Sequence, residues 1–229
     1  MTDFKRYAVY FAPQPGALSQ FGAAWLGWDP VAGGPVDPPE VRDLPAPVHE
    51  LTATPRKYGM HATIKAPFRL DDGVTQVQLD RALGDLCATL SPVETDGIEI
   101  AQLGGFLALI PMGDTRDLNA LAGHVVAALD SYRAPLSAAE IARRKPEALS
   151  THQRALLERW GYPFVMDEFR FHITLTGRLT PEDARATRTA LLPVMGAMLP
   201  APFVIDALCL FGEDQDGMFH YISRHTLAG

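Results

Sequence analysis

The stretch GMHATIKAPF, residues 59–68, contains the pattern His-x-Thr followed by an aliphatic residue, and EFRFHITLTG, residues 168–177, contains it again. The first copy begins at His61 and the second at His172. Both lie in β-prone runs, where branched and aromatic residues alternate with polar ones. Two strands of one design, one in each half of the chain, predict a two-lobed protein whose motif strands face a shared cleft.

The segments that follow the two motifs also correspond to each other. Each motif precedes an apolar stripe with helical spacing, then two β-prone runs that flank a turn. These elements are helices expected over 74–90 and 180–195 and hairpins expected over 98–110 and 203–226. Their matched order and spacing indicate an internal duplication.

The rest of the chain completes the two lobes. We expect one two-lobed domain over residues 1–229, with motif-bearing halves at roughly 48–130 and 168–229. An N-terminal strand and helix occupy 1–47, and 131–167 reads as a helical insertion. With 229 residues the chain is long enough to bury a large core.

The motif strands should have one apolar and one polar face, because successive side chains of a strand point to opposite sides. In the first strand, His61, Thr63 and Lys65 share the polar face. The corresponding face of the second strand is expected to carry Arg170, His172, Thr174 and Thr176. A single polar face of this kind would also be expected for an ordinary solvated strand. Two such motifs in matched positions favour a catalytic site.

The residue types suit acid–base chemistry on a phosphate ester. An unperturbed imidazole has a pKa of about 6.5, so near neutral pH one of a pair can be neutral and the other charged. The neutral ring takes a proton from water, and the charged ring gives one to the leaving oxygen. The threonine hydroxyls, Lys65 and Arg170 can stabilise the phosphate oxygens. The residue types alone leave open which histidine is the base.

Composition excludes some classes. The net charge of −7 argues against a general nucleic-acid binder, which would be basic. The segment 1–6 has three charged residues and no apolar signal-peptide core, and the chain has no apolar run of membrane-spanning length, so we expect a cytoplasmic protein without membrane association. The two cysteines lie in apolar runs and are read as buried thiols.

No cofactor is predicted, because the chain has neither a P-loop nor a GxGxxG fingerprint. A metal site is the main chemical alternative, since His61, His172 and His220 could in principle bind zinc. The chain has no HExxH pattern and no closely spaced Cys/His set, and threonine is a poor ligand. We therefore predict no metal.

The two motifs, taken with the longer strings PRKYGMHATIKAPFRL (55–70) and WGYPFVMDEFRFHITLTGRL (160–179), resemble the two-histidine (2H) phosphoesterase superfamily. That superfamily includes RNA 2′,5′-ligase-like proteins and cyclic phosphodiesterases. The long strings, the opening RYAVYFAP and the stretch LSAAEIARRKPEAL are similar to an uncharacterised branch found with carbon–phosphorus lyase genes and labelled phosphonate metabolism proteins.

This resemblance implies an α+β fold with two lobes, each an antiparallel sheet with helices outside, related by pseudo-twofold symmetry around a central cleft. It also implies metal-independent cleavage of a phosphodiester, often a cyclic one. The family's catalytic positions fall on His61, Thr63, His172 and Thr174. In phosphonate breakdown, the implied substrate is a ribose 1,2-cyclic phosphate that carries a 5-phosphate.

Further substrate-binding candidates lie outside the motif strands. Tyr58 could stack on a sugar, and Tyr10 could face the cleft from the first strand; ordinary packing is the alternative for both. Arg143 and Arg144 either complement the dipole at the end of a short helix or form a basic lid on the site.

The sequence thus favours a phosphoric diester hydrolase acting on a small phosphorylated sugar or nucleotide, possible partners being the enzymes of phosphonate degradation. One alternative is an enzyme that processes 2′,5′ or cyclic phosphate ends of RNA. Another is a binding protein for a phosphorylated ligand without catalysis.

Overall fold

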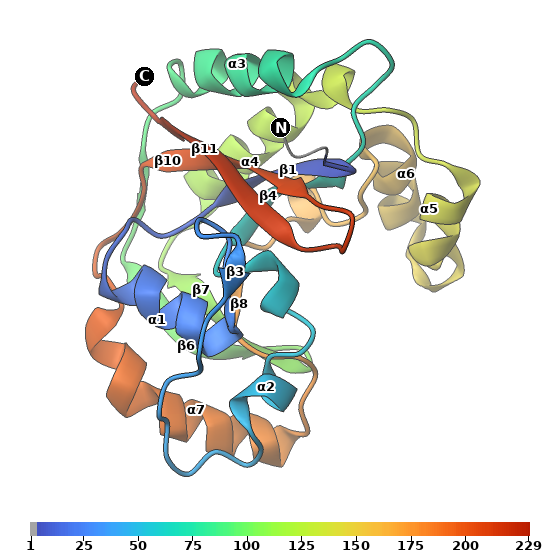
Figure 1. Ribbon diagram of the computed structural model, residues 1–229. Helices are drawn as coiled ribbons and strands as arrows, with labels where there is room; N and C mark the ends of the chain where they lie inside the picture. Colours follow the sequence, from blue (N-terminus) through green and yellow to red (C-terminus); the bar gives the residue numbers. More distant parts are fainter. Residues whose placement is uncertain (1–3) are drawn as a thin grey trace.

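Seven strands form one antiparallel sheet within residues 4–229, the part of the chain that this computed structural model describes (Figure 1). They are β1 (Arg6–Phe11), β4 (Ala62–Phe68), β6 (Gly97–Leu103), β7 (Phe106–Met112), β8 (Ile173–Thr174), β10 (Ala207–Glu213) and β11 (Phe219–Thr226). Their order is β11-β10-β1-β4-β8-β7-β6. Residues 1–3, part of the charged N-terminal segment, lie outside the described residues.

Helices surround this sheet. They are α1 (Ala17–Leu26), α2 (Val48–Leu51), α3 (Gln76–Cys87), α4 (Arg116–Ala128), α5 (Ala138–Arg143), α6 (Thr151–Trp160) and α7 (Pro181–Met195). Short 3₁₀ turns are η1 (Arg56–Tyr58), η2 (Asp130–Tyr132), η3 (Pro146–Ala148), η4 (Met166–Glu168) and η5 (Gly196–Met198). Two small strand pairs, β2 (Trp28–Asp29) with β3 (Gly34–Pro35) and β5 (Val93–Thr95) with β9 (Phe203–Ile205), complete the fold.

Local capping signals place several helix starts. Ser137 and Ser150 each accept a hydrogen bond from the backbone N–H three residues on, in the capping boxes that begin α5 and α6. Thr180 caps α7 in the same way, with Pro181 in its first turn. Because such bonds join residues within one turn, the sequence is enough to locate them.

The second motif strand is much shorter than the sequence suggests. The expectation that Arg170 to Thr176 all lie in one strand is wrong in extent, since β8 spans only Ile173–Thr174. The amide of Leu175 still bonds to Leu107 O of β7 at 2.9 Å, but the amide of Leu107 bonds to Thr176 Oγ1 at 3.0 Å, and that of Gly177 bonds to Leu51 O at 2.7 Å. The regular pairing with β7 therefore ends at Leu175, and by Gly177 the polypeptide has turned toward α2.

The expected antiparallel sheets with helices outside are confirmed, and the two sheets are joined rather than separate. One part consists of β11, β10, β1 and β4, and the other of β8, β7 and β6. They meet where Ala62 of β4 pairs with Ile173 of β8. The seam between the two parts of the sheet thus coincides with the two motifs.

The two sequence halves exchange their hairpins. The hairpin β6–β7, which follows the first motif, pairs with β8 of the second motif. The hairpin β10–β11, which follows the second motif, pairs with β1 and through it with β4. Helices follow the same rule: α3 contacts β10 and β11, whereas α7 contacts β6 and β7 (Figure 1). Each part of the sheet is therefore built from both halves of the chain.

Strand β1 places two different cores on its two faces. Tyr7, Val9 and Phe11 belong to the main apolar core. Ala8 and Tyr10 belong to a smaller cluster with Cys209, Phe211 and Phe219. The smaller cluster lies next to the first motif, because the Tyr10 ring packs on that of His61 with centroids 4.0 Å apart.

Candidate active site

His61 is held by the turn that precedes β4. Its Nδ1–H donates a hydrogen bond to Gly59 O, two residues earlier, at 3.0 Å. A carbonyl oxygen can only accept, so Nδ1 carries the proton and Nε2 remains an acceptor. Gly59 has a φ of 68°, and a Cβ there would lie 2.7 Å from Pro30, so this turn requires glycine.

His172 is held by the same device. It directly precedes β8, and its Nδ1–H donates to Arg170 O, again two residues earlier, at 2.7 Å. Its Nε2 is therefore also the ring nitrogen left for proton exchange. The two motifs share a geometry as well as a sequence pattern, since the ring of each histidine is oriented by the carbonyl oxygen two residues before it.

The register between β4 and β8 brings the two motifs together. With Ala62 opposite Ile173, His61 stands opposite Thr174, and His172 stands opposite Thr63. Directly opposed residues of an antiparallel pair have Cα atoms roughly 4.5–5.5 Å apart, and diagonal neighbours remain within reach of long side chains. Each histidine thus faces the threonine of the other motif, and the two rings lie on one diagonal.

The motif residues line two adjoining cavities. One of about 570 Å³ contains His61, and one of about 500 Å³ contains His172. Thr63 and Phe106 line both, and Thr174 lines the first. Phe106 also packs on His172, with ring centroids 5.7 Å apart. The two histidines therefore open onto a continuous region on the same face of the sheet.

Burial sets the protonation of His61. Desolvation lowers the pKa of its imidazole to about 4; the bond to Gly59 opposes this shift, and the nearby His172 adds to it. Thr63 Oγ1 lies 3.3 Å from Nε2, in hydrogen-bonding distance. At neutral pH, His61 is consequently a neutral ring with an acceptor nitrogen in the cavity.

Lys65 does not share the histidine face, and this prediction is wrong. Tyr10 pairs with Thr63 and Val9 pairs with Lys65, so Ile64 is an extra residue in a β-bulge that reverses the alternation. The Lys65 ammonium is buried and donates to Val126 O, at the end of α4, at 3.0 Å. It ties β4 to α4 on the opposite side of the strand.

Two other candidates on the second motif strand have most of their polar groups engaged. Thr176 lines the His61 cavity, but its hydroxyl donates to Gly177 O at 2.9 Å and accepts from the Leu107 amide at 3.0 Å. Arg170 lines the His172 cavity, and its guanidinium donates to Asp167 O at 2.9 Å. Arg170 is exposed, so its remaining N–H groups are accessible to a ligand.

The candidates outside the motif strands divide into two groups. Tyr10, Tyr58 and Arg144 line the His61 cavity. The Tyr58 ring lies 5.3 Å from that of His61. Arg143 is exposed at the end of α5 and does not line the cavity, so the expectation that both arginines reach the site is wrong for Arg143. Consecutive residues of a helix point about 100° apart, which separates the two side chains.

Sequence reasoning missed several residues of the cavity. They are Arg6, Thr54, Phe106, Tyr162 and Arg178. A signal existed for Arg6, because it precedes Tyr10 by four residues in a strand and so belongs on the same face. The others reach the cavity from loops and strand ends whose positions depend on the tertiary fold.

A set of residues suitable for a metal is not apparent around the motifs. Across residues 4–229, no group of three or more His, Cys, Asp or Glu side chains is placed to hold a metal ion. His220 bonds to Asp214 at 2.7 Å and packs against Trp28, and it is not among the residues that line the two histidine cavities.

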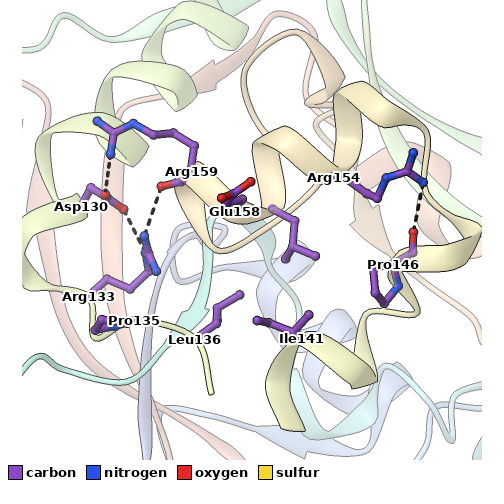
Figure 2. Close-up of a pocket in the computed structure, with 10 residues that line it drawn as sticks. Asp130, Arg133, Pro135, Leu136, Ile141, Pro146, Arg154, Glu158 and Arg159 are labelled. Carbon is purple, nitrogen blue, oxygen red and sulfur yellow. Dashed lines mark hydrogen bonds and ion pairs between the residues drawn. The ribbon is translucent and has the colours of Figure 1, made fainter. Parts of the chain in front are cut away.

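A further cavity, of about 650 Å³, lies between α5, α6 and the segment after α4 (Figure 2). Asp130 anchors it, bonding to Arg133 Nε at 2.9 Å and lying 3.7 Å from Arg159 and from Lys65. It shares no lining residue with the His61 cavity. The ion pairs of Asp130 attach the helical insertion at 131–167 to the end of α4 and to β4.

No helix within residues 4–229 combines the length and the apolar character needed to cross a bilayer.

Comparison with known proteins gives a family. Residues 63–220 match the model described as "Protein of unknown function (DUF1045)", and the chain belongs to this family. Curated relatives include "Ribose 1,5-bisphosphate phosphokinase PhnN" of Janthinobacterium sp. (strain Marseille), 37% identical over 93% of the chain and 48% of the relative. The protein of the same name from Laribacter hongkongensis is 33% identical over 96% and 51%. The chain spans about half the length of these relatives.

Three solved structures are similar to this chain over nearly its whole length. E. coli LigT, complexed with 3′-AMP, has a TM-score of 0.43 and 13% identity over 99% of this chain and 100% of LigT. TT0787 of Thermus thermophilus has a TM-score of 0.45 and 14% identity over 98% of each chain. Another crystal structure, described only as that of a phosphoesterase, has a TM-score of 0.44 and 14% identity over 99% and 100%.

Proposed function

We propose that this protein is a two-histidine phosphoesterase that hydrolyses a cyclic phosphodiester of a small phosphorylated sugar or nucleotide. The observation that carries the proposal is the pairing of Ala62 with Ile173, which sets His61 and His172 on one diagonal of one sheet face. Both rings are fixed through Nδ1, so both leave Nε2 for proton transfer. A phosphate placed between them meets one imidazole on each side.

The protonation of His61 supports a division of roles. Because burial lowers its pKa to about 4, His61 is neutral at pH 7 and acts as the general base. It takes a proton from water, and the water oxygen forms a new bond to phosphorus. The bond from phosphorus to the ester oxygen breaks on the opposite side, and a protonated His172 supplies the proton to that oxygen. The product is a phosphomonoester and a free hydroxyl.

The threonines complete this arrangement. Thr63 and Thr174 stand opposite the two histidines across the β4–β8 seam. Their hydroxyls can donate hydrogen bonds to the non-bridging oxygens, whose negative charge grows in the transition state. Thr63 lines both cavities, which suits contact with a group held between the two rings.

The names of the relatives support the substrate class. The proteins named ribose 1,5-bisphosphate phosphokinase share about half their length with this chain, and the name refers to a ribose that carries two phosphates. We therefore place the proposed substrate among phosphorylated sugars, with phosphonate degradation as its metabolic setting and the enzymes of that process as candidate partners.

A turnover screen tests the proposal. Purified protein is incubated with cyclic phosphates of nucleosides and of phosphorylated ribose, with and without EDTA, and products are followed by phosphorus NMR. We expect conversion of at least one cyclic phosphate to a phosphomonoester at a rate that EDTA does not change. Failure to hydrolyse any member of the panel, or turnover that persists in His61→Ala and His172→Ala, would falsify the proposal.

A further inference from the structure

The His61 cavity is also lined by polar side chains that the acid–base reaction does not require. They are Arg6 of β1, Tyr10 of β1, Tyr58 of η1, Arg144 after α5 and Tyr162 after α6. They also influence one another electrostatically: Arg144 interacts with Tyr162, Arg6 and Tyr58, and Tyr10 interacts with Tyr58 and Arg6. Segments far apart in the sequence thus converge on one polar group of residues, which we call the arginine cluster.

Arg144 brings a positive charge without an ion-pair partner to the arginine cluster. Its guanidinium packs over the Tyr162 ring, 4.7 Å from the ring centroid. Among residues 4–229, no carboxylate forms an ion pair with it. Arg144 is partly buried, and this burial lowers the pKa of its guanidinium by disfavouring the charged form. A charge in that position favours an anionic ligand.

Arg6 supports the site differently, because its charge is already balanced. Its Nη2 donates to Glu213 Oε1 at 2.8 Å, and its Nε donates to the other oxygen of the same carboxylate. This two-point bond fixes the guanidinium plane and leaves Nη1 without a bond to Glu213. The net charge of Arg6, Glu213 and Arg144 together is therefore that of Arg144.

Tyr10 supplies a hydroxyl that lacks a partner. The residue is 0% exposed, and within residues 4–229 its hydroxyl makes no hydrogen bond. Tyr10 lines the His61 cavity. Buried polar groups are nearly always bonded, so its unpaired hydroxyl is available to a ligand atom that reaches it. The Tyr10 ring lies directly on His61, so such a ligand atom would be close to the reacting group.

We propose that Arg144, Arg6 and the Tyr10 hydroxyl form a second anion subsite, which binds a phosphomonoester carried by the same molecule whose phosphodiester lies between His61 and His172. This inference rests on the proposed function and deepens it: the substrate carries two phosphates. The cation of Arg144 meets the phosphomonoester charge, and Arg6 and Tyr10 donate hydrogen bonds to its oxygens. The helical insertion that carries Arg144 thereby acts as a specificity element.

Two matched substrates test the subsite. Cytidine 2′,3′-cyclic phosphate and its 5′-phosphorylated form differ only in the second phosphate. The measured quantity is the ratio of their kcat/KM values, in the wild type, in Arg144→Gln and in the control Arg143→Gln, which changes the exposed neighbouring arginine. We expect the wild type and the control to prefer the 5′-phosphorylated substrate by about 10- to 100-fold, the usual contribution of a charged hydrogen bond. In Arg144→Gln this ratio should fall close to one.

The outcomes separate the subsite from the proposed function. If the wild type hydrolyses both probes equally well, or if Arg144→Gln retains the preference, the subsite is wrong and the phosphoesterase proposal stands. If the wild type hydrolyses neither probe, binding of ribose 5-phosphate is measured by calorimetry in the same three proteins. Binding by the wild type and the control that weakens at least about tenfold in Arg144→Gln supports the subsite; equal binding in all three, or none, overturns it.

Discussion

Ala62 of β4 and Ile173 of β8 are direct antiparallel partners, and their pairing joins the two parts of the seven-stranded sheet. Both residues are fully buried, so the strands present their His and Thr side chains on the opposite face. The register is therefore fixed by core packing rather than by the polar residues themselves. A shift by one residue would bury both histidines, which is why the apolar residues of the motif matter as much as the polar ones.

Removal of either imidazole should abolish most of the turnover. We expect His61→Ala and His172→Ala each to lower kcat by about 10²- to 10⁴-fold, because each removes one proton transfer. His49→Ala, which changes an exposed histidine of α2, serves as the matched control and should retain wild-type rates. Initial rates are measured on the best substrate of the screen. Only a small loss of rate in both active-site variants would show that the histidines do not carry out the proton transfers.

The acidic limb of the pH–activity profile should lie at a lower pH than is usual for a histidine base. Because burial lowers the pKa of His61 to about 4, the base stays neutral well below pH 6. We expect kcat/KM to form a bell-shaped profile whose acidic limb lies near pH 4 to 5, rather than near the ordinary histidine pKa of about 6.5. A profile whose acidic limb is centred at pH 6.5, or one that is flat from about pH 4 to 8, would contradict the assignment of His61 as the base.

The same pKa shift predicts a loss of stability in acid. Between pH 6.5 and 4 the unfolded chain protonates His61 whereas the folded protein does not, so the unfolded state binds more protons. Stability from this group is fully present above about pH 6.5 and is lost as the pH falls toward 4. In His61→Gln this contribution is absent, so its unfolding free energy should fall less between pH 7 and 5 than that of the wild type. Urea unfolding at both pH values measures the difference, and identical decreases would refute the prediction.

Lys65 should affect stability and leave substrate binding unchanged. Lys65→Met removes the buried hydrogen bond to Val126 O, and we expect the unfolding free energy to fall by about 1–3 kcal/mol. Lys145→Met changes an exposed lysine and should have an effect of less than about 0.5 kcal/mol. Urea denaturation and KM are measured for both. A raised KM with unchanged stability in Lys65→Met would show that Lys65 contributes to substrate binding instead.

Tyr10→Phe should stabilise the protein while weakening binding. The variant removes a buried hydroxyl that has no partner, so the unfolding free energy should rise by about 1 kcal/mol. Tyr7→Phe, on the same strand, removes a hydroxyl that donates to Gln76 at 3.4 Å and should give no such gain. With the 5′-phosphorylated probe, KM should increase in Tyr10→Phe. A destabilised variant with unchanged KM would show that the hydroxyl has a structural partner instead.

The exchange of hairpins between the two halves shows which parts of the fold the internal repeat predicts and which it does not. The helix and hairpin after each motif were predictable because they depend on local periodicity and turn residues, such as Gly104 with its φ of 58°. Which strand each hairpin pairs with depends on contacts between distant segments. The two motifs have the same local pattern, so nothing in that pattern distinguishes pairing within a half from pairing between halves.

The sequence by itself determined the two His-x-Thr motifs, the faces of the strands up to the first irregularity, and the helix caps at Ser137, Ser150 and Thr180. These features follow from interactions within a few residues. Only the tertiary structure decided that a bulge at Ile64 turns Lys65 away from the site and that Arg144, rather than Arg143, enters the cavity. Both outcomes depend on the packing of a segment against a distant partner, and such long-range contacts leave no periodic trace in the chain.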